Sequence, residues 1–251
     1  MDKKYLRNNQ YLDSKNLDAR ISLHQQYSTN PINLWDWTSS QYHLKNNDKI
    51  LEVGCGTGDF WKTQQNKLPL NIEITLSDFS EGILNQCRVN LDNPPWQFCL
   101  ADVEDLCFNN DSYDWVLAHM MLYHTKSKEK ALFEIKRVLR PNGCTGILTV
   151  GDTHMSRLIP TDSDNMTITF NESIADKIIP TYFKKFEKHI YEDCLIIQDI
   201  GPIIAYLHSS PSFKNKSLSD QNKIVNTINF EIQSRGSFSV PKRLVLYICH
   251  K

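Results

Sequence analysis

The stretch Lys49-Ile-Leu-Glu-Val-Gly-Cys-Gly-Thr-Gly-Asp-Phe60 decides the fold of this chain. Its first residues, 49–53, are mostly apolar, so they predict a short buried strand that carries one acid, Glu52. Three alternating glycines follow, Gly54, Gly56 and Gly58. Because glycine reaches backbone conformations closed to other residues, we expect a sharp turn that brings the backbone against a ligand, and then a helix.

Acidic residues at the ends of three apolar runs indicate what kind of ligand this is. A glycine loop alone also fits a nicotinamide dinucleotide, but Glu52 would repel a phosphate and favours a cofactor with positive charge. Asp78 ends the apolar run 72–77, about 20 residues beyond the glycines, where an acid can bind both hydroxyls of a ribose. Asp102 ends the run 96–101 and can accept a hydrogen bond from an adenine amino group. The glycine loop contains no Lys or Arg for a phosphate.

Several motifs in register carry a resemblance to a known family. They are Leu51-Glu-Val-Gly-Cys-Gly-Thr-Gly58, Asp78-Phe-Ser80, Ala101-Asp-Val103 and the segments 108–119 and 134–143. Together they resemble the class I S-adenosylmethionine-dependent methyltransferases of the UbiE-like, methyltransferase type 11 family over residues 48–150. One departure is Pro141-Asn-Gly143, where the family usually has Pro-Gly-Gly, and Asn tolerates a left-handed turn nearly as well as Gly.

The resemblance implies a cofactor and a set of residues that bind it. The cofactor is S-adenosyl-L-methionine, and Asp78 is implied to bind its ribose. Phe79 is expected either to stack on adenine or to pack in the core, and Asp102 either to bind adenine or to serve in a turn. The full set of expected cofactor-binding residues is Glu52, Gly54, Cys55, Gly56, Gly58, Asp78, Phe79, Ala101, Asp102, Val103, His119 and Arg20.

Strands that alternate with helices predict an α/β fold with a parallel sheet and right-handed crossovers. Strands are expected at 49–53, 73–77, 96–100, 113–118 and 143–150, and helices at 16–27, 32–43, 59–65, 80–90 and 127–139. After residue 150 the pattern loosens: 151–157 can start a helix, 186–191 and 243–249 predict two strands, and 200–207 and 218–234 predict helices. The family resemblance implies a Rossmann-like, doubly wound, seven-stranded, mostly parallel sheet with a helical N-terminal lid and an antiparallel last strand.

No repeat or flexible linker divides the sequence, so we expect a single methyltransferase domain over residues 1–251. Residues 1–45 are expected to form the helical lid and residues 46–150 the cofactor-binding core. Residues 151–251 are expected to contribute substrate-side insertions and the C-terminal strands.

Histidines and lid residues are the candidates for catalysis and substrate binding. His119 ends a strand where the reactive methyl group is expected, so it can contact the cofactor, act as a general base, or simply end the strand. His124 is a second, weaker catalytic candidate. Arg20 can pair with the cofactor carboxylate or form a surface ion pair. The candidate substrate-binding residues, which can equally be packing or surface residues, are Tyr11, His24, Tyr27, Trp35 and His154.

Composition limits the partners and the compartment. The 28 basic residues nearly balance the 29 acidic ones, so no nucleic-acid footprint is indicated. No secretory signal or run of about 18 apolar residues is visible, and the expected location is the cytoplasm. The seven cysteines form no Cys-x-x-Cys pair, which is typical of reduced thiols, and no metal site is expected. We expect a small-molecule substrate, no nucleic-acid or membrane partner, and a monomer or homodimer.

The sequence therefore predicts S-adenosylmethionine-dependent transfer of a methyl group to O, N or C of a small metabolite. Two alternatives stay open. One is a methyltransferase that acts on RNA or protein, for which the short basic group at 184–188 is weak support. The other is a protein that uses S-adenosylmethionine in a non-methylating step such as cyclisation, since the same fold and binding residues would serve it.

Overall fold

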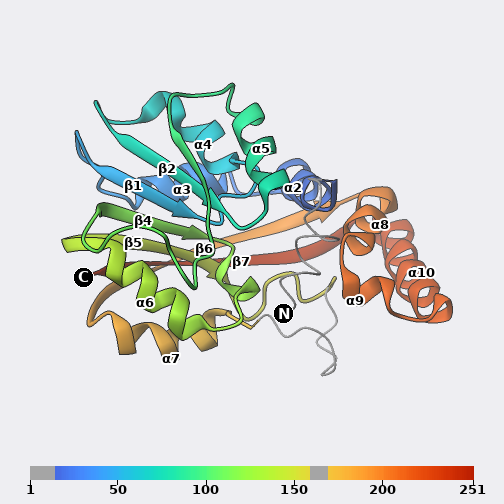
Figure 1. Ribbon diagram of the computed structural model, residues 1–251. Helices are drawn as coiled ribbons and strands as arrows, with labels where there is room; N and C mark the ends of the chain where they lie inside the picture. The colour runs from blue at the N-terminus through green and yellow to red at the C-terminus, as the bar shows by residue number, and fades with distance from the viewer. Residues whose placement is uncertain (1–14, 159–168) are drawn as a thin grey trace.

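A single twisted sheet of seven strands organises the protein, as a computed structural model that describes residues 15–158 and 169–251 shows (Figure 1). The strand order is β3-β2-β1-β4-β5-β7-β6. Neighbouring strands are parallel from β3 to β5, and β7 is antiparallel to both β5 and β6. The predicted Rossmann-like sheet with an antiparallel last strand is confirmed.

The described elements follow one another in the order expected of strands joined by helices. The strands are β1 Lys49–Val53, β2 Glu73–Asp78, β3 Gln97–Leu100, β4 Tyr113–His119, β5 Leu139–Val150, β6 Lys185–Ile197 and β7 Phe238–His250. The helices are α2 Lys15–Tyr27, α3 Leu34–Ser40, α4 Asp59–Gln64, α5 Glu81–Asn90, α6 Lys128–Val138, α7 Glu172–Tyr182, α8 Ile200–His208, α9 Pro211–Lys214 and α10 Leu218–Arg235. Short 3-10 turns add Gln65–Lys67 and Leu122–His124.

Helices cover both faces of the sheet, because the central strands are apolar on both sides. In Figure 1, α3, α4 and α5 lie on one face and α6 and α7 on the other. One buried cluster includes Phe60 and Trp61 of α4 together with Leu76 of β2. A second includes Ile135 of α6 and Ile179 of α7. Two apolar layers therefore enclose the strands and fix where their carboxyl ends lie.

The β6–β7 hairpin extends well past the end of β5. The last β5–β7 pair is Val150 with Leu244, whereas β6 and β7 stay paired for six further positions, to Ile197 with Phe238. This extension carries α8, α9 and α10 beyond the carboxyl end of the sheet, where α2 also packs (Figure 1). A third apolar core forms there, and we call this unit the distal subdomain. Its buried residues include Leu23, Leu195, Ile203, Tyr206, Phe213, Ile232 and Val240.

Among the local predictions, one about a turn is confirmed, one about a helix is wrong, and one helix was not predicted. Asn142 is left-handed with φ 66°, as the Pro-Asn-Gly turn predicts. Residues 152–158 form turns and no helix, because their amides bond within the loop and to β7, as Met155 N does to Pro241 O (2.8 Å). The helix α7 was not predicted, although Asn171 caps it by accepting a hydrogen bond from Ile174 N. Pro180 inside α7 conceals the helical pattern.

None of the helices in residues 15–158 and 169–251 has the length and apolar character needed to cross a membrane.

Candidate active site

The glycine loop wraps around the carboxylate of Asp78. The three loop glycines all have positive φ, at 66°, 57° and 84°, which L side chains rarely adopt. Gly56 N donates to Asp78 Oδ2 (3.2 Å), and Ser80 N donates to Asp78 Oδ1 (2.9 Å). Burial raises the pKa of Asp78 to about 6. Each carboxylate oxygen keeps lone-pair capacity, so Asp78 can still accept hydrogen bonds from a pair of neighbouring hydroxyls.

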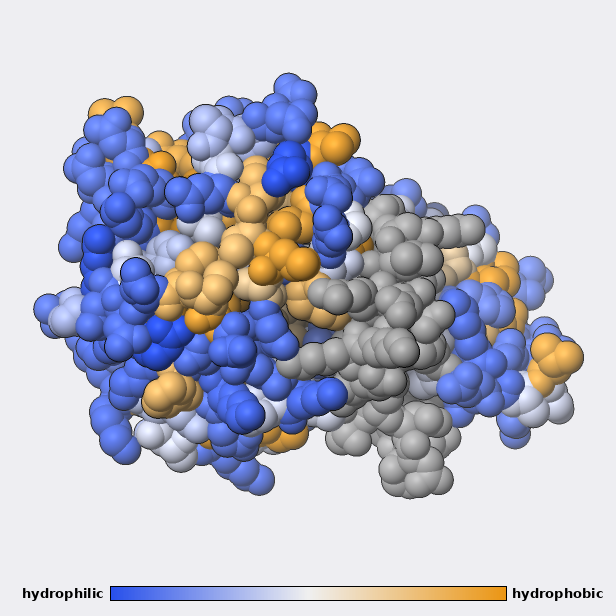
Figure 2. All heavy atoms as spheres, viewed as in Figure 1, coloured by the Kyte–Doolittle hydropathy of each residue, from blue (hydrophilic) through white to orange (hydrophobic). Residues whose placement is uncertain are grey.

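A cleft lies beside this loop, at the carboxyl ends of β1, β2, β3 and β4. Figure 2 shows apolar side chains gathered on this face of the molecule, over the segment that follows β3. Of the charged residues described here, only acids line the cleft, so its electrostatics favour a cation. The lining residues are Gly54, Phe79, Ala101, Asp102, Val103, Glu104, Met121, His124 and Thr125.

Met121 packs tightly against the first loop glycine. A Cβ placed on Gly54 would lie 2.8 Å from Met121 Cβ, closer than such atoms approach one another. The enclosed part of the cleft has a volume of about 40 Å³, room for a few water molecules. A nucleoside is larger than this enclosed space, so it would have to extend along the open part of the groove or displace the flexible Met121 side chain.

Glu52 and His119 belong to a buried chain of hydrogen bonds. Glu52 Oε1 is 2.8 Å from His119 Nδ1, and His119 Nε2 is 2.6 Å from the Tyr42 hydroxyl. Trp61 Nε1 donates to the other oxygen of Glu52. Both ring nitrogens of His119 have partners in this chain, and its side chain is 2% exposed, so a role of His119 as general base stays a prediction. Glu52 and His119 are not among the described residues that line the cleft.

His124 reaches the cleft from the 3-10 turn after β4. Burial, with a smaller contribution from the positive charge of Arg20, lowers the pKa of His124 to about 3. The imidazole is therefore neutral at physiological pH and a weak base. Of the two catalytic histidines that the sequence suggests, only His124 lies at the cleft.

Arg20 is held by the distal subdomain. Its Nε donates to Ser209 Oγ (2.9 Å), and its Nη2 donates to the Ser209 carbonyl (2.7 Å) at the end of α8. These bonds link α2 to α8 across 189 residues, which no local sequence pattern indicates, and the pairing of Arg20 with a cofactor carboxylate stays a prediction.

Two of the predicted substrate-binding residues lie together in the distal subdomain. The rings of His24 on α2 and His154 after β5 stack with centroids 5.9 Å apart, and Tyr206 of α8 meets His24 edge-on. Burial lowers the pKa of His24 to about 3 and holds the pKa of His154 well below its usual range. Both imidazoles are therefore neutral, and their buried Nδ1 atoms have no hydrogen-bond partner among the described residues.

The other predicted substrate residues are not at this cluster. Tyr27 packs at the edge of the distal core. Trp35 of α3 contacts Phe60 and His119, with ring centroids 5.8 and 5.7 Å away. Tyr11 lies outside the described residues.

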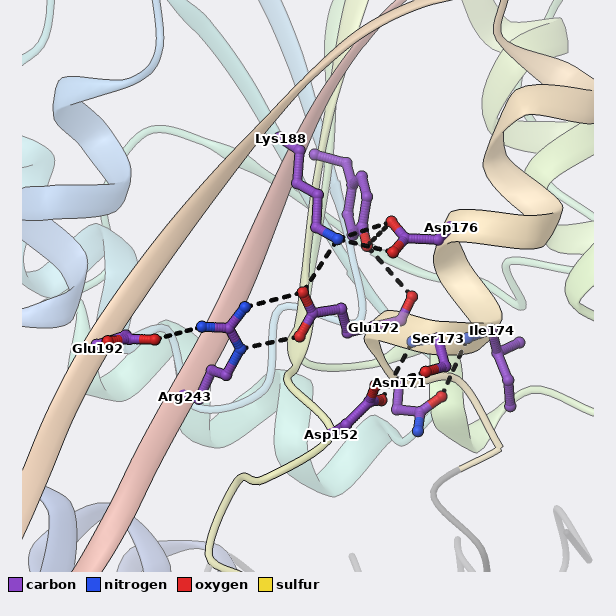
Figure 3. A network of polar contacts seen from close by, with 10 residues as sticks. Asp152, Asn171, Glu172, Ser173, Ile174, Asp176, Lys188, Glu192 and Arg243 are labelled. Atoms are coloured by element: carbon purple, nitrogen blue, oxygen red, sulfur yellow. Dashed lines mark hydrogen bonds and ion pairs between the residues drawn. The ribbon is translucent and has the colours of Figure 1, made fainter.

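An ion-pair network fixes the segment that carries His154 (Figure 3). Arg243 of β7 binds Glu172 of α7 through two hydrogen bonds of 2.9 and 3.0 Å, and its side chain lies where a Cβ of Gly151 would be. Asp152 accepts a hydrogen bond from Ser173 N (3.1 Å). The turn after β5 is thus held between β7 and α7.

Sequence analysis missed several residues at the site. Met121, Thr125 and Glu104 line the cleft, and the hydrogen-bonding roles of Tyr42 and Trp61 toward Glu52 were not foreseen. The position of Met121 just after β4 is a usable signal, since ligands bind at strand carboxyl ends. No cluster of metal-binding side chains occurs in the described ranges.

Comparison with known proteins identifies the fold and the core. Residues 50–143 match the model of a family described as "Methyltransferase domain". The chain is 32% identical over 114 residues to a ubiquinone/menaquinone biosynthesis C-methyltransferase UbiE of Neisseria meningitidis, covering 45% of this chain and 46% of the relative. It is 25% identical over 162 residues to a malonyl-[acyl-carrier protein] O-methyltransferase of Calditerrivibrio nitroreducens, covering 64% and 61%.

A solved structure has the same fold. It is phosphoethanolamine N-methyltransferase 2 of Haemonchus contortus in complex with S-adenosyl-L-methionine, at a TM-score of 0.61 and 15% identity, covering 98% of this chain and 59% of that one. The matched region spans about half the length of the UbiE relative. The matched region and the sheet order agree, and residues 50–143 are similar to a methyltransferase domain within a class I, Rossmann-like fold.

Proposed function

We propose that this protein binds S-adenosyl-L-methionine in the cleft and transfers its methyl group to O, N or C of a small-molecule metabolite. The observation that carries the proposal is the carboxylate of Asp78, held by Gly56 N and Ser80 N beside the cleft. This pairing leaves the two oxygens directed by the backbone, as recognition of two adjacent ribose hydroxyls requires.

The rest of the cleft suits the other parts of the cofactor. Phe79 and Val103 offer apolar surface for a purine, and Asp102 offers a carboxylate for an amino group. Among the described lining residues, Asp102 and Glu104 are the charged ones, which supports a sulfonium cation over a pyrophosphate. Gly54 has no side chain, so a ligand can contact its backbone. A Cβ at this position would clash with Met121.

Among the described residues, neither His119 nor His124 is a ready general base, which supports a mechanism based on positioning. When bound, the cofactor supplies an activated methyl group on a good leaving group. The protein then has to align the acceptor and exclude water. His124, with a pKa lowered to about 3, is a poor proton acceptor, and His119 is occupied by Glu52 and Tyr42. We therefore favour an acceptor atom that is nucleophilic without the removal of a proton by a strong base.

The proposed substrate end lies where the distal subdomain meets the core. We propose that the neutral, buried rings of His24 and His154, together with Tyr206, select the metabolite. Retaining the expected domain organisation, we assign residues 1–45 and 151–251 to the lid and substrate side. A small, largely uncharged substrate fits such surroundings better than an RNA, which needs a basic surface. A soluble cytoplasmic enzyme, as a monomer or homodimer, remains our expectation.

Transfer of an isotopically labelled methyl group tests the proposal. The purified protein is incubated with S-adenosylmethionine labelled with ¹³C on its methyl group and with metabolite extracts, and products are detected by mass spectrometry. We expect a metabolite that gains one labelled methyl group together with S-adenosylhomocysteine, and no such product with the Asp78→Ala variant. Conversion of a metabolite without uptake of label would contradict methyl transfer and favour the non-methylating alternative.

A further inference from the structure

Two thiols lie in contact beside the cofactor cleft. Cys99 is on β3, Cys107 follows it by eight residues, and their Sγ atoms are 3.7 Å apart. Cys107 is exposed and Cys99 is partly exposed, and both are free thiols. The segment between them contains Ala101, Asp102 and Val103, which line the cleft.

We propose that Cys99 and Cys107 are a site of reversible oxidation, at which a peroxide links them in a disulfide that alters the adenine end of the cleft. The exposed Cys107 thiolate attacks the peroxide and becomes a sulfenic acid, releasing hydroxide. The Cys99 sulfur then attacks the Cys107 sulfur, the S–O bond breaks and the disulfide forms. Two thiols are oxidised and one hydrogen peroxide is reduced to two waters.

The surroundings of the two cysteines assign the order of these steps. Burial, followed by the hydrogen bond to Cys107, raises the pKa of Cys99 to about 11, so Cys99 stays protonated until its partner has reacted. A second thiol pair, Cys55 and Cys87, has Sγ atoms 3.8 Å apart, but both residues are buried. Oxidation is therefore directed to the accessible pair, because reactivity requires access.

Closing the disulfide moves one side of the cleft. A disulfide has an S–S distance of about 2.05 Å, so the sulfurs must approach by about 1.7 Å from their 3.7 Å separation. The Cys107 side is held, because Arg137 donates to the carbonyls of Leu106 and Phe108 (2.8 and 2.7 Å). Glu134 also accepts from Leu106 N (2.8 Å).

The Cys99 side is freer to move. β3 is an edge strand that pairs only with β2 in the described sheet. Its next residue, Ala101, bonds through its amide to the Asp78 carbonyl (3.0 Å). A shift of β3 toward Cys107 should therefore displace Asp102 in the loop and the backbone of Asp78. We expect the oxidised protein to lose the equivalent of one cofactor hydrogen bond, a three- to tenfold weaker affinity at about 1 kcal/mol per bond.

Peptide mapping tests the site directly. No Lys or Arg lies between Arg88 and Lys126, so trypsin releases residues 89–126 as one peptide that contains both cysteines. Reduced protein is treated with equimolar hydrogen peroxide, free thiols are alkylated, and the digest is analysed without reductant. We expect this peptide to lose two hydrogens and escape alkylation, whereas the peptides of Cys55 and Cys87 stay alkylated. Dithiothreitol should reverse the change.

Variants and a ligand titration complete the test. Cys99→Ser and Cys107→Ser should each abolish the disulfide, and neither oxidised variant should show the weaker S-adenosylhomocysteine affinity expected of oxidised wild type. Absence of the 99–107 linkage, or its formation only together with oxidation of the buried pair, would overturn the site. A mapped disulfide with unchanged affinity would overturn its effect on the cleft. Failure of the reduced protein to bind S-adenosylhomocysteine would refute the proposed function, while the mapping still decides the disulfide.

Discussion

The cofactor cleft and the distal subdomain lie at the same end of the sheet but are built in different ways. At the cleft, backbone amides and glycines of neighbouring segments form the site, as Gly56 N does with Asp78. In the distal subdomain, side chains from distant segments meet, as Arg20 does with Ser209 and Ser28 with Asp193 (2.5 Å). The first region therefore depends on backbone geometry, whereas the second depends on the side chains that hold distant segments together.

The ion pair Lys242–Asp193 is the strongest single test of the distal subdomain. The nitrogen and oxygen are 3.0 Å apart, and the side chains are 5% and 0% exposed. Lys242→Met leaves the Asp193 charge buried without its partner, so the free energy of unfolding should fall by about 3–5 kcal/mol in a urea titration. Affinity for S-adenosylhomocysteine should stay within about threefold of wild type. The exposed Lys223→Met is the matched control; an equal loss there would remove the special role of the pair.

Asp78→Ala should have the largest effect on cofactor binding. Removing a carboxylate that accepts two hydroxyl hydrogen bonds should weaken S-adenosylhomocysteine binding by about 100-fold or more, measured by calorimetry. Glu73→Ala is the matched control, because Glu73 begins the same strand and pairs with Lys49 at the surface. Near-wild-type binding by the Asp78→Ala protein would show that the two regions do not differ as we describe.

Alanine at Gly54 tests whether close packing or backbone conformation dominates in the loop. Gly54 and Gly236 both have a positive φ, 66° and 80°. A Cβ added at Gly54 would clash with Met121, whereas a Cβ added at Gly236 would have no neighbouring atom of the described residues within 4 Å. Gly236→Ala should cost about 1 kcal/mol of unfolding free energy from backbone strain alone. Gly54→Ala should cost about 1–3 kcal/mol more and should also weaken cofactor binding. Equal costs would argue against tight packing at the cleft.

The smallest expected change in cofactor affinity is its dependence on pH. In our proposal, ribose hydroxyls donate to the ionised Asp78, whose pKa burial raises to about 6, so affinity for S-adenosylhomocysteine should fall about tenfold from pH 7 to pH 5. In the free protein the sign is opposite: a raised pKa contributes stability below pH 4 that is lost as pH rises through 6. Calorimetry in buffers of different ionisation enthalpy measures the linked proton. Affinity independent of pH over this range would exclude Asp78 as the titrating contact.

The gathering of these residues at the strand ends was predictable because its signals are local. Gly54, Asp78 and Asp102 stand at strand ends, and a parallel sheet brings such ends together whatever the loops do. The strand Lys49–Val53 was predicted to the residue, and the helix expected at 80–90 is α5, which Ser80 caps by accepting from Ile83 N. Here short-range chemistry and topology give the same answer.

Other features depend on contacts that no local pattern contains. The partners of His119 are set by Tyr42, 77 residues away, and by Glu52, 67 residues away. The contact of Arg20 with Ser209 was not predicted, because Ser209 ends a helix that the long β6–β7 hairpin brings near α2. Such pairings form only in the folded protein. The sequence therefore indicates that these residue types are present but not which partners they bind.

Calorimetric titration of the reduced wild-type protein with S-adenosylhomocysteine, and in parallel with NADH, tests the central claim most directly. The acids at the cleft and the ribose-directed Asp78 predict one site of micromolar affinity for S-adenosylhomocysteine and no measurable binding of NADH. Binding of NADH with no binding of S-adenosylhomocysteine would contradict the assignment of this cleft.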